Sequence, residues 1–236
     1  MSRNQTHFCE DSKMSFSPEW EHLYASGAHH SVWPWSELIS LIMRHARPHQ
    51  SEAPVQVLEI GCGVGANIPL VQWFGGVFHG VDNSASALAS IRQRYGDKIE
   101  LAQADFCEDI PFIGPFDIVI DRASLTHNFT SGIELSLDMV EKRLAPGGVY
   151  VGVHWFSTDC DDFKLGEPTE DPHVRKGYSR GDFAGVGQVH FADQACMEHL
   201  FSNFSIEVLD HVISEAVKPE RQRLGWWNIV AKKKNT

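Results

Sequence analysis

The chain has 236 residues, 42% of them hydrophobic, which is enough for one substantial core. Its formal net charge of −11 argues against a nucleic-acid partner, because proteins that bind nucleic acid carry a basic face toward the phosphates. No apolar run approaches the roughly 20 residues of a membrane span, and the first six residues are too polar for a signal peptide, so we expect a soluble, cytoplasmic protein with no membrane partner.

The N-terminal fifty residues combine a polar beginning with many aromatic side chains. We expect residues 1–13 to form a flexible leader. Three tryptophans and a tyrosine follow between positions 20 and 35, and such side chains must pack against something. Residues 14–50 therefore predict either a helix that seals one side of a sheet or an aromatic lid over a cationic ligand. Tyr24 and Trp33 are candidate substrate contacts.

A buried strand and a glycine-rich turn begin at Val55. The apolar run ends at Ile60, the glycines follow as Gly-x-Gly-x-Gly, and residues 66–74 read as a helix. Glycines let the backbone approach a ligand closely at this edge of a parallel sheet. A dinucleotide site has Gly-x-Gly-x-x-Gly spacing and binds a pyrophosphate. Glu59 would repel phosphate, and it suits a ligand that carries an ammonium and a sulfonium.

Two further strands also end in acidic residues. The second, residues 77–81, leads to Asp82, which lies 21 residues after Gly61, the interval at which a carboxylate meets the hydroxyls of a ribose. Asn83 and Ser84 then begin a helix over residues 85–95. A strand over residues 99–102 leads to Asp105 and Phe106, a carboxylate beside an apolar wall that suits an adenine.

These segments, taken in order, resemble the class I S-adenosylmethionine-dependent methyltransferases. The resemblance covers roughly residues 50–155 and implies a Rossmann-like α/β fold, with a seven-stranded, mostly parallel sheet, helices on both faces and an antiparallel last strand. It implies S-adenosyl-L-methionine as the cofactor. An aromatic segment before the glycine turn is loosely similar to the thiopurine and tellurite-resistance members. The matching pieces are residues 59–65, 81–84, 104–106, 116–121 and 144–148, and the expected cofactor-binding residues are Glu59, Gly61, Cys62, Gly63, Asp82, Asn83, Asp105, Phe106 and Asp121.

In such an enzyme the cofactor brings its own leaving group, so the protein mainly aligns the reactants, and alignment supplies about 7–11 kcal/mol. A hydroxyl nucleophile also benefits from a base, worth roughly 10²–10⁴ in rate. The matching piece over residues 116–121 is expected to be the fourth strand. The residues that follow it should border the reacting methyl group, because parallel sheets bind ligands at the carboxyl ends of their strands. His127 is the first candidate base, His154 the second and His190 the third, while Asp121 orients the base or contacts the cofactor.

The segment over residues 156–191 is too long for an ordinary connection, since loops longer than about 12–15 residues are usually functional or disordered. We expect it to be a substrate cover. Its basic run, residues 175–180, would grip a phosphate or carboxylate, as in a sugar nucleotide, so Arg175, Tyr178 and His190 are expected to contact the substrate.

Cysteine and metal chemistry are not expected. The five cysteines are scattered, odd in number and without a Cys-x-x-Cys pair, which excludes a disulfide framework and a zinc motif. A metal-assisted alternative stays open, in which Asp121, His127, His154 and Asp159 hold a divalent ion that activates a hydroxyl.

The C-terminal part predicts a helix over residues 193–201 and strands over 205–213 and 225–231, with Trp226 and Trp227 filling the core. We therefore expect one methyltransferase domain over residues 14–236 that methylates a small polar acceptor, most often at a hydroxyl, with a sugar or glycan precursor as one candidate. Two alternatives remain. One is an NAD-dependent oxidoreductase, which lacks support from the glycine spacing and from a Tyr-x-x-x-Lys pair, and the other is a non-catalytic partner protein that binds the cofactor only.

Overall fold

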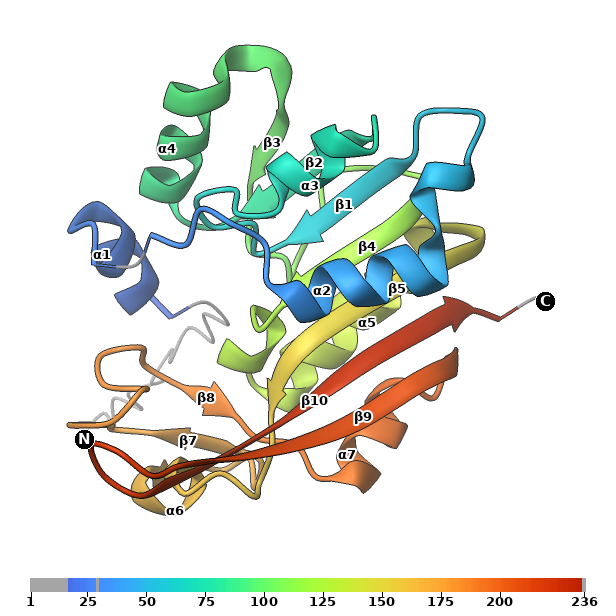
Figure 1. Ribbon diagram of the computed structural model, residues 1–236. Helices are drawn as coiled ribbons and strands as arrows, with labels where there is room; N and C mark the ends of the chain where they lie inside the picture. The colour runs from blue at the N-terminus through green and yellow to red at the C-terminus, as the bar shows by residue number, and fades with distance from the viewer. Residues whose placement is uncertain (1–16, 29, 235–236) are drawn as a thin grey trace, which may run out of the picture.

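A seven-stranded sheet organises the chain (Figure 1). The computed structural model describes residues 17–28 and 30–234, so the expected leader over residues 1–13 lies outside the described residues. The strand order is β3-β2-β1-β4-β5-β10-β9, and in this sheet of the described chain β10 runs in the opposite direction to the other six strands. The strands are β1 (Gln56–Ile60), β2 (Val77–Asp82), β3 (Glu100–Gln103), β4 (Phe116–Arg122), β5 (Leu144–Phe156), β9 (Phe204–Ala216) and β10 (Gln222–Lys233).

Helices cover both faces of this sheet, because alternate side chains of each buried strand point to opposite faces. In Figure 1, α2 lies on the face toward the viewer and α5 on the far face. Val57 packs in one apolar cluster with α2, α3 and α4, whereas Leu58 packs in the other with α5 and α7. The helices are α1 (Glu19–Ala25), α2 (Ser36–Leu41), α3 (Ile68–Trp73), α4 (Ala85–Tyr95), α5 (Thr130–Arg143), α6 (Asp162–Leu165) and α7 (Gln194–Leu200), with short turns over 42–46, 48–50, 96–98 and 125–127.

The aromatic N-terminal segment divides into two parts with different partners. Leu38 and Ile42, in and after α2, are fully buried against the sheet, so this part seals one face. Helix α1 instead lies above the N-terminus of α4, where the Glu21 carboxylate accepts hydrogen bonds from Ser84 Oγ (2.6 Å) and Ser86 Oγ (2.5 Å). We call α1 the lid. The α2 part thus seals one face of the sheet, while a lid over a bound ligand stays a prediction for the α1 part.

Residues 156–191, which we call the cover, form an ordered unit with an apolar cluster of their own. They contain α6 and a small three-stranded antiparallel sheet made of β6 (Glu167–Pro168), β7 (Val174–Lys176) and β8 (Val189–His190). Trp20 and Leu23 of the lid pack against this cluster, which is built around Phe183, Val189 and Phe191. The lid and the cover therefore meet across the same edge of the large sheet.

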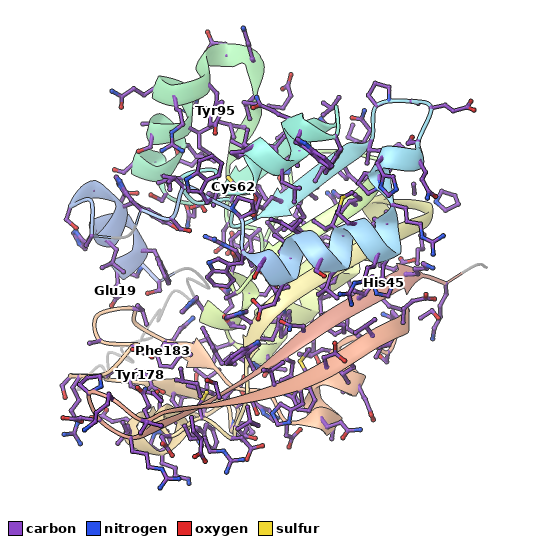
Figure 2. The ribbon with its side chains drawn as sticks, viewed as in Figure 1. Glu19, His45, Cys62, Tyr95, Tyr178 and Phe183 are labelled. Atoms are coloured by element: carbon purple, nitrogen blue, oxygen red, sulfur yellow. The ribbon has the colours of Figure 1, made fainter. Side chains whose placement is uncertain are left out.

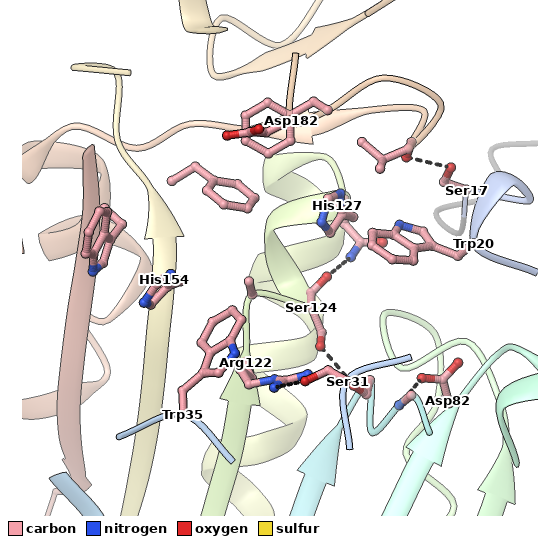
Figure 3. Close-up of a pocket in the computed structure, with 18 of the residues that line it drawn as sticks. Ser17, Trp20, Ser31, Trp35, Asp82, Arg122, Ser124, His127, His154 and Asp182 are labelled. Atoms are coloured by element: carbon pink, nitrogen blue, oxygen red, sulfur yellow. Dashed lines mark hydrogen bonds between the residues drawn. The ribbon is translucent and has the colours of Figure 1, made fainter. Parts of the chain in front are cut away.

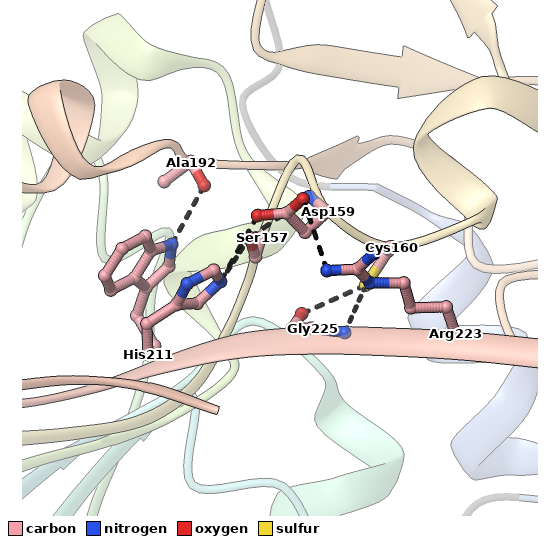
Figure 4. Close-up of polar contacts among 8 residues, drawn as sticks. Ser157, Asp159, Cys160, Ala192, His211, Arg223 and Gly225 are labelled. Atoms are coloured by element: carbon pink, nitrogen blue, oxygen red, sulfur yellow. Dashed lines mark hydrogen bonds and ion pairs between the residues drawn. The ribbon is translucent and has the colours of Figure 1, made fainter. Parts of the chain in front are cut away.

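Polar contacts tie the start of the cover to the two longest strands (Figure 4). Ser157 Oγ lies 2.8 Å from His211 Nε2 on β9, and the Cys160 thiol donates to the Gly225 carbonyl of β10 at 3.0 Å. Asp159 forms ion pairs with His211 and with Arg223, at 3.7 and 3.8 Å. These contacts fix where the cover leaves β5.

The expected fold class is confirmed, including helices on both faces and an antiparallel last strand. That strand is last in the chain, yet it inserts between β5 and β9. The sequence did not predict α5. No helix in the described residues is long and apolar enough to cross a membrane.

Candidate functional site

A cavity of about 550 Å³ opens at the carboxyl ends of β1, β2, β4 and β5, between the lid and the cover (Figure 3). The lining comes from the glycine turn, from the segment after β4, from the end of β5 and from β10. Parallel sheets place their ligand sites at this edge. The lining residues used below are Tyr24, Trp20, Trp35, Gly61, Cys62, Gly63, Asp82, Phe106, Arg122, Ser124, His127, His154, Phe156, Asp182, Phe183 and Trp226.

The turn after β1 needs its glycines for two separate reasons. Gly61 and Gly63 have φ angles of +64° and +50°, which side chains with a Cβ adopt at a cost. A Cβ on Gly61 would lie 2.3 Å from Ser124 Cβ, and one on Gly63 would lie 2.6 Å from Tyr24 Oη. The turn is thus held between the lid and the segment after β4.

Asp82 is the buried carboxylate at the end of β2. Its Oδ2 accepts a hydrogen bond from Gly63 N and its Oδ1 one from Ser84 N, both at 2.8 Å. Burial raises the pKa of Asp82 to about 6, although these hydrogen bonds oppose the shift. Because Asp82 lines the cavity, it offers a bound ligand a hydrogen-bond acceptor beside the glycine turn.

Glu59 lies behind the glycine turn and is 2% exposed. Its Oε1 accepts a hydrogen bond from Asn67 Nδ2 at 2.7 Å, but its Oε2 is buried with no hydrogen-bond partner among the described residues. Burial raises the pKa of Glu59 to about 8, partly offset by the nearby Arg122 guanidinium. An orphaned, desolvated carboxylate oxygen at this place is suited to a cationic or hydroxyl-bearing ligand.

Some of the remaining residues that were expected to bind the cofactor line the cavity, and the others lie outside the lining. Phe106 and Cys62 line the cavity, whereas Asn83 and Asp105 are not part of the lining. Burial raises the pKa of the Cys62 thiol well above its usual value, so the thiol is not an activated nucleophile. Asp105 Oδ1 accepts a hydrogen bond from Cys107 N at 2.9 Å and shapes the turn after β3.

Asp121 supports the segment after β4 from inside the core. It is fully buried, with Oδ1 accepting from Ser124 N (2.8 Å) and Oδ2 from Tyr150 Oη (3.0 Å). Ser124 Oγ in turn donates to the Gly61 carbonyl at 3.0 Å. Asp121 therefore links the two loops that form the cavity floor without lining the cavity itself.

His127 lines the cavity between the aromatic rings of Trp20 and Phe156. Its Nδ1 lies 3.2 Å from the Gln188 carbonyl of the cover. A neutral imidazole that donates from Nδ1 carries its lone pair on Nε2. The cover thus favours the tautomer that a proton acceptor requires.

His154, at the end of β5, also lines the cavity. Its backbone φ of +59° is rare for a residue with a side chain, and it turns the ring between Trp35 and Trp226, with centroids at 4.3 and 4.7 Å. The Nε2 atom lies 3.2 Å from Glu37 Oε2. Burial lowers the pKa of His154, which leaves it neutral near pH 7.

Of the expected substrate contacts, Tyr24 alone lines the cavity. Trp33 is 70% exposed, and Arg175 stacks over the Phe163 ring at 4.0 Å on the far side of the cover. Tyr178 packs on Phe183 inside the cover (Figure 2). His190 is fully buried beside Thr130, with Nε2 3.1 Å from its Oγ1. None of these four side chains is part of the cavity lining.

Several lining residues were not singled out in the sequence. Trp226 was expected to fill the core, and this expectation was wrong, because its ring stacks on His154 and lines the cavity. Trp227 does fill the core, with 6% exposure and its indole N–H on the Ala192 carbonyl. Successive side chains of a strand point to opposite faces of the sheet, so the neighbouring tryptophans of β10 could have been assigned to different faces from the sequence. The other lining residues without an expected site role include Arg122, Phe156, Asp182 and Phe183, whereas Trp20 and Trp35 belong to the aromatic segment expected to seal the sheet or to cover the ligand.

The four residues of the metal-assisted alternative do not form one cluster. Both oxygens of Asp121 accept hydrogen bonds in the core, and Asp159 pairs with His211 and Arg223 at the start of the cover. Among the described residues, the group with metal-like spacing is a different one, His173, His190 and Cys196. Cys62, Cys107, Cys160 and Cys196 are buried, and no disulfide joins any two of these four.

Comparison with known proteins agrees with this geometry. Residues 57–148 match the model of a family described as a methyltransferase domain. No curated protein matches the chain significantly.

Solved structures share the fold at low sequence identity. A SAM-dependent methyltransferase structure from Methanosarcina mazei is 18% identical, with 78% of this chain and 94% of that chain covered and a TM-score of 0.63. The 1,6-didemethyltoxoflavin-N1-methyltransferase of Burkholderia thailandensis, solved with bound 1,6-didemethyltoxoflavin and S-adenosylhomocysteine, is 16% identical over 91% of this chain and 85% of that chain, with a TM-score of 0.63. TehB from Haemophilus influenzae is 14% identical over 92% and 67%, with a TM-score of 0.60.

Proposed function

We propose that this chain, which carries the methyltransferase domain of the class I S-adenosylmethionine-dependent enzymes, transfers the methyl group to a hydroxyl of a small, flat and mostly apolar acceptor. The methyltransferase match leaves no support for the NAD-dependent alternative. The observation that carries the proposal is the position of His127 in an aromatic cavity wall, opposite the glycine turn and held by the cover.

The residues present fit the cofactor. The backbone of Gly61 and Gly63 together with the Asp82 carboxylate would hold its polar parts, and Phe106 would pack against its base. The unpartnered Glu59 oxygen is a hydrogen-bond acceptor near the turn, and the guanidinium of Arg122 is a buried cation, which together suit a ligand with an ammonium and a carboxylate. When bound, the cofactor supplies an electrophilic methyl group.

The chemistry of the lining supports a flat acceptor. Aromatic rings form two walls, one made of Trp20, Phe156 and Phe183 and the other of Trp35 and Trp226. Such walls favour ring stacking and exclude water. Among the described lining residues, Arg122 is the single cationic side chain, and it lies over the Trp35 ring at 4.4 Å with Nη1 on Ser31 Oγ. The basic run near Arg175 lies outside the cavity, so a sugar nucleotide is not supported.

His127 is the base that the arrangement favours. A base must lie within hydrogen-bond reach of the proton that it accepts, and it works best with a pKa near the working pH. His127 lines the cavity between Trp20 and Phe156, whereas the ring of His154 is stacked between Trp35 and Trp226 and His190 is fully buried and not part of the lining. We therefore assign removal of the acceptor's proton to His127. We assign His154 to the cavity wall, where it packs against the acceptor without exchanging a proton with it.

The lid and the cover act together in this proposal. Ser17, two residues before the lid, donates a hydrogen bond from its Oγ to the Val186 carbonyl of the cover at 3.2 Å. Glu21 of the lid accepts a hydrogen bond from Ser84 Oγ at the start of α4. The closed arrangement keeps water from the reacting groups. The single domain that we propose over residues 14–236 thus consists of a methyltransferase sheet with these two embellishments.

The test is methyl transfer from labelled S-adenosylmethionine to a panel of hydroxylated ring compounds, aliphatic sugars and amines. Turnover with hydroxylated ring compounds supports the proposal. Turnover with sugars or amines and none with ring hydroxyls would refute the acceptor class while leaving the methyltransferase identity in place. Binding of S-adenosylhomocysteine without turnover of any acceptor would favour the non-catalytic partner protein.

A further inference from the structure

We propose that His173, His190 and Cys196 form a zinc site that clamps the cover onto the body of the enzyme. One donor atom from each of these residues lies within 4.8 Å of the other two. They come from three separate segments, because His173 precedes β7, His190 ends β8 and Cys196 belongs to α7. No cysteine or histidine spacing in the sequence joins them, so this site exists only in the folded chain.

His190 directs one ring nitrogen at the rest of this cluster. Its Nε2 lies 3.1 Å from Thr130 Oγ1 and 4.0 Å from the Cys196 sulfur. This nitrogen is therefore the atom of His190 that would bind the ion, and the metal bond would replace its contact with Thr130.

His173 is oriented for the same task. Its Nδ1 lies 3.1 Å from the Phe191 carbonyl, which leaves Nε2 as the nitrogen with the lone pair. Metal-bound histidines commonly donate their other N–H to a carbonyl or carboxylate in this manner. Asp171 adds support, since its Oδ1 accepts from His173 N (2.9 Å) and its Oδ2 from Thr130 N (2.8 Å).

The donor set and its size favour zinc. Two imidazoles and one thiolate suit Zn²⁺, whose bonds of about 2.0–2.3 Å place a nitrogen and a sulfur roughly 3.6 Å apart on one ion. The observed 4.0 Å between Cys196 Sγ and His190 Nε2 therefore needs only a small contraction. Binding replaces the thiol proton of Cys196 by a zinc–sulfur bond and releases that proton to the solvent.

The position gives the site a structural task. His190 lies two residues after Gln188, which contacts the proposed base His127, and Cys196 anchors the same region to α7. A zinc ion would fix β8 against α7 and thereby the cover against the cavity. This inference does not depend on which acceptor the enzyme methylates.

The experiment measures metal binding by the full chain without an affinity tag. Titration of the metal-free protein with Co²⁺ should give one equivalent per chain, with a thiolate-to-cobalt charge-transfer band and the visible bands of a tetrahedral ion, and Zn²⁺ should displace it. Cys196→Ser should remove the charge-transfer band, and His190→Gln should weaken binding at least about tenfold, the smallest loss that even outer-shell changes typically cause. Cys107→Ser, a buried thiol outside the cluster, should bind like the wild type.

Thermal unfolding keeps the test decisive if a variant is destabilised. Zn²⁺ should raise the Tm of the wild type and of Cys107→Ser, but not that of Cys196→Ser. No stoichiometric binding by the folded wild type, or an unchanged charge-transfer band in Cys196→Ser, would overturn the proposal.

Discussion

Gln188 and His127 hold each other through two hydrogen bonds across the cavity edge. The Gln188 carbonyl lies 3.2 Å from His127 Nδ1, and Gln188 Nε2 donates to the His127 carbonyl at 3.2 Å. One residue of the cover thus fixes both the ring and the backbone of the proposed base. In the proposed reaction the cover therefore positions the base and also forms a wall of the cavity.

His127→Asn should lower kcat by about 10²–10⁴, the usual contribution of a general base, and remove the acidic limb of the pH–rate profile. Binding of S-adenosylhomocysteine, measured by calorimetry, should change little because the glycine turn is untouched. His49→Asn, on an exposed turn, is the matched control and should behave like the wild type. A kcat within a factor of two of the wild type would remove His127 from the base assignment.

Glu59→Gln should change how stability depends on pH. A carboxyl whose pKa is higher in the folded chain binds its proton more tightly there, so its folded state loses stability as pH rises from 4.5 through about 8. The ligand-free wild type should accordingly lose Tm over this interval more steeply than Glu59→Gln. Parallel Tm curves would show that Glu59 is ionised in the free protein at neutral pH.

Gly63→Ala should destabilise the chain more than Gly75→Ala. Both positions have positive φ, at +50° and +74°, so both substitutions carry a strain of about 1–2 kcal/mol. Only at Gly63 does the new Cβ also meet a side chain, Tyr24 Oη at 2.6 Å, while Gly75 has nothing within 4 Å. Urea unfolding measures the difference.

A double-mutant cycle locates the cause of that difference. Adding Tyr24→Phe to Gly63→Ala should recover part of the lost stability, because the hydroxyl that meets the new methyl group is gone. Strict additivity of the two changes would place Tyr24 away from the glycine turn in solution.

Trp226→Leu should raise the acceptor KM while leaving the cofactor affinity nearly unchanged. The indole stacks on His154 at 4.7 Å and forms one cavity wall, and such ring contacts contribute about 0.5–1.5 kcal/mol. The expected increase in KM is therefore roughly 2–10-fold. Trp73→Leu, with its indole 71% exposed, serves as the control. An equal effect of both substitutions would argue against a stacked acceptor.

The local sequence determined the core of the fold and the cofactor side of the cavity. Strand periodicity, the glycine turn and the helix cap at Ser84 act over neighbouring residues, and Ser84 Oγ does accept from Ala87 N at 3.0 Å. Such features are readable because backbone geometry and burial on one face depend on residues only a few positions apart. The helix over residues 85–95 was placed at its observed ends for this reason.

The acceptor side was decided by tertiary structure alone. Trp20, Phe183 and Trp226 are separated by most of the chain, yet all three line one cavity. The stacking of Arg175 on Phe163, the packing of Tyr178 on Phe183 and the proximity of His173 to Cys196 likewise depend on how the cover folds back on the sheet. The sequence by itself determined that the chain builds a class I methyltransferase sheet with a glycine turn, because those signals are local. Only the folded chain decided which side chains face the acceptor, because long-range packing sets the direction of each side chain and leaves no periodic trace in the sequence.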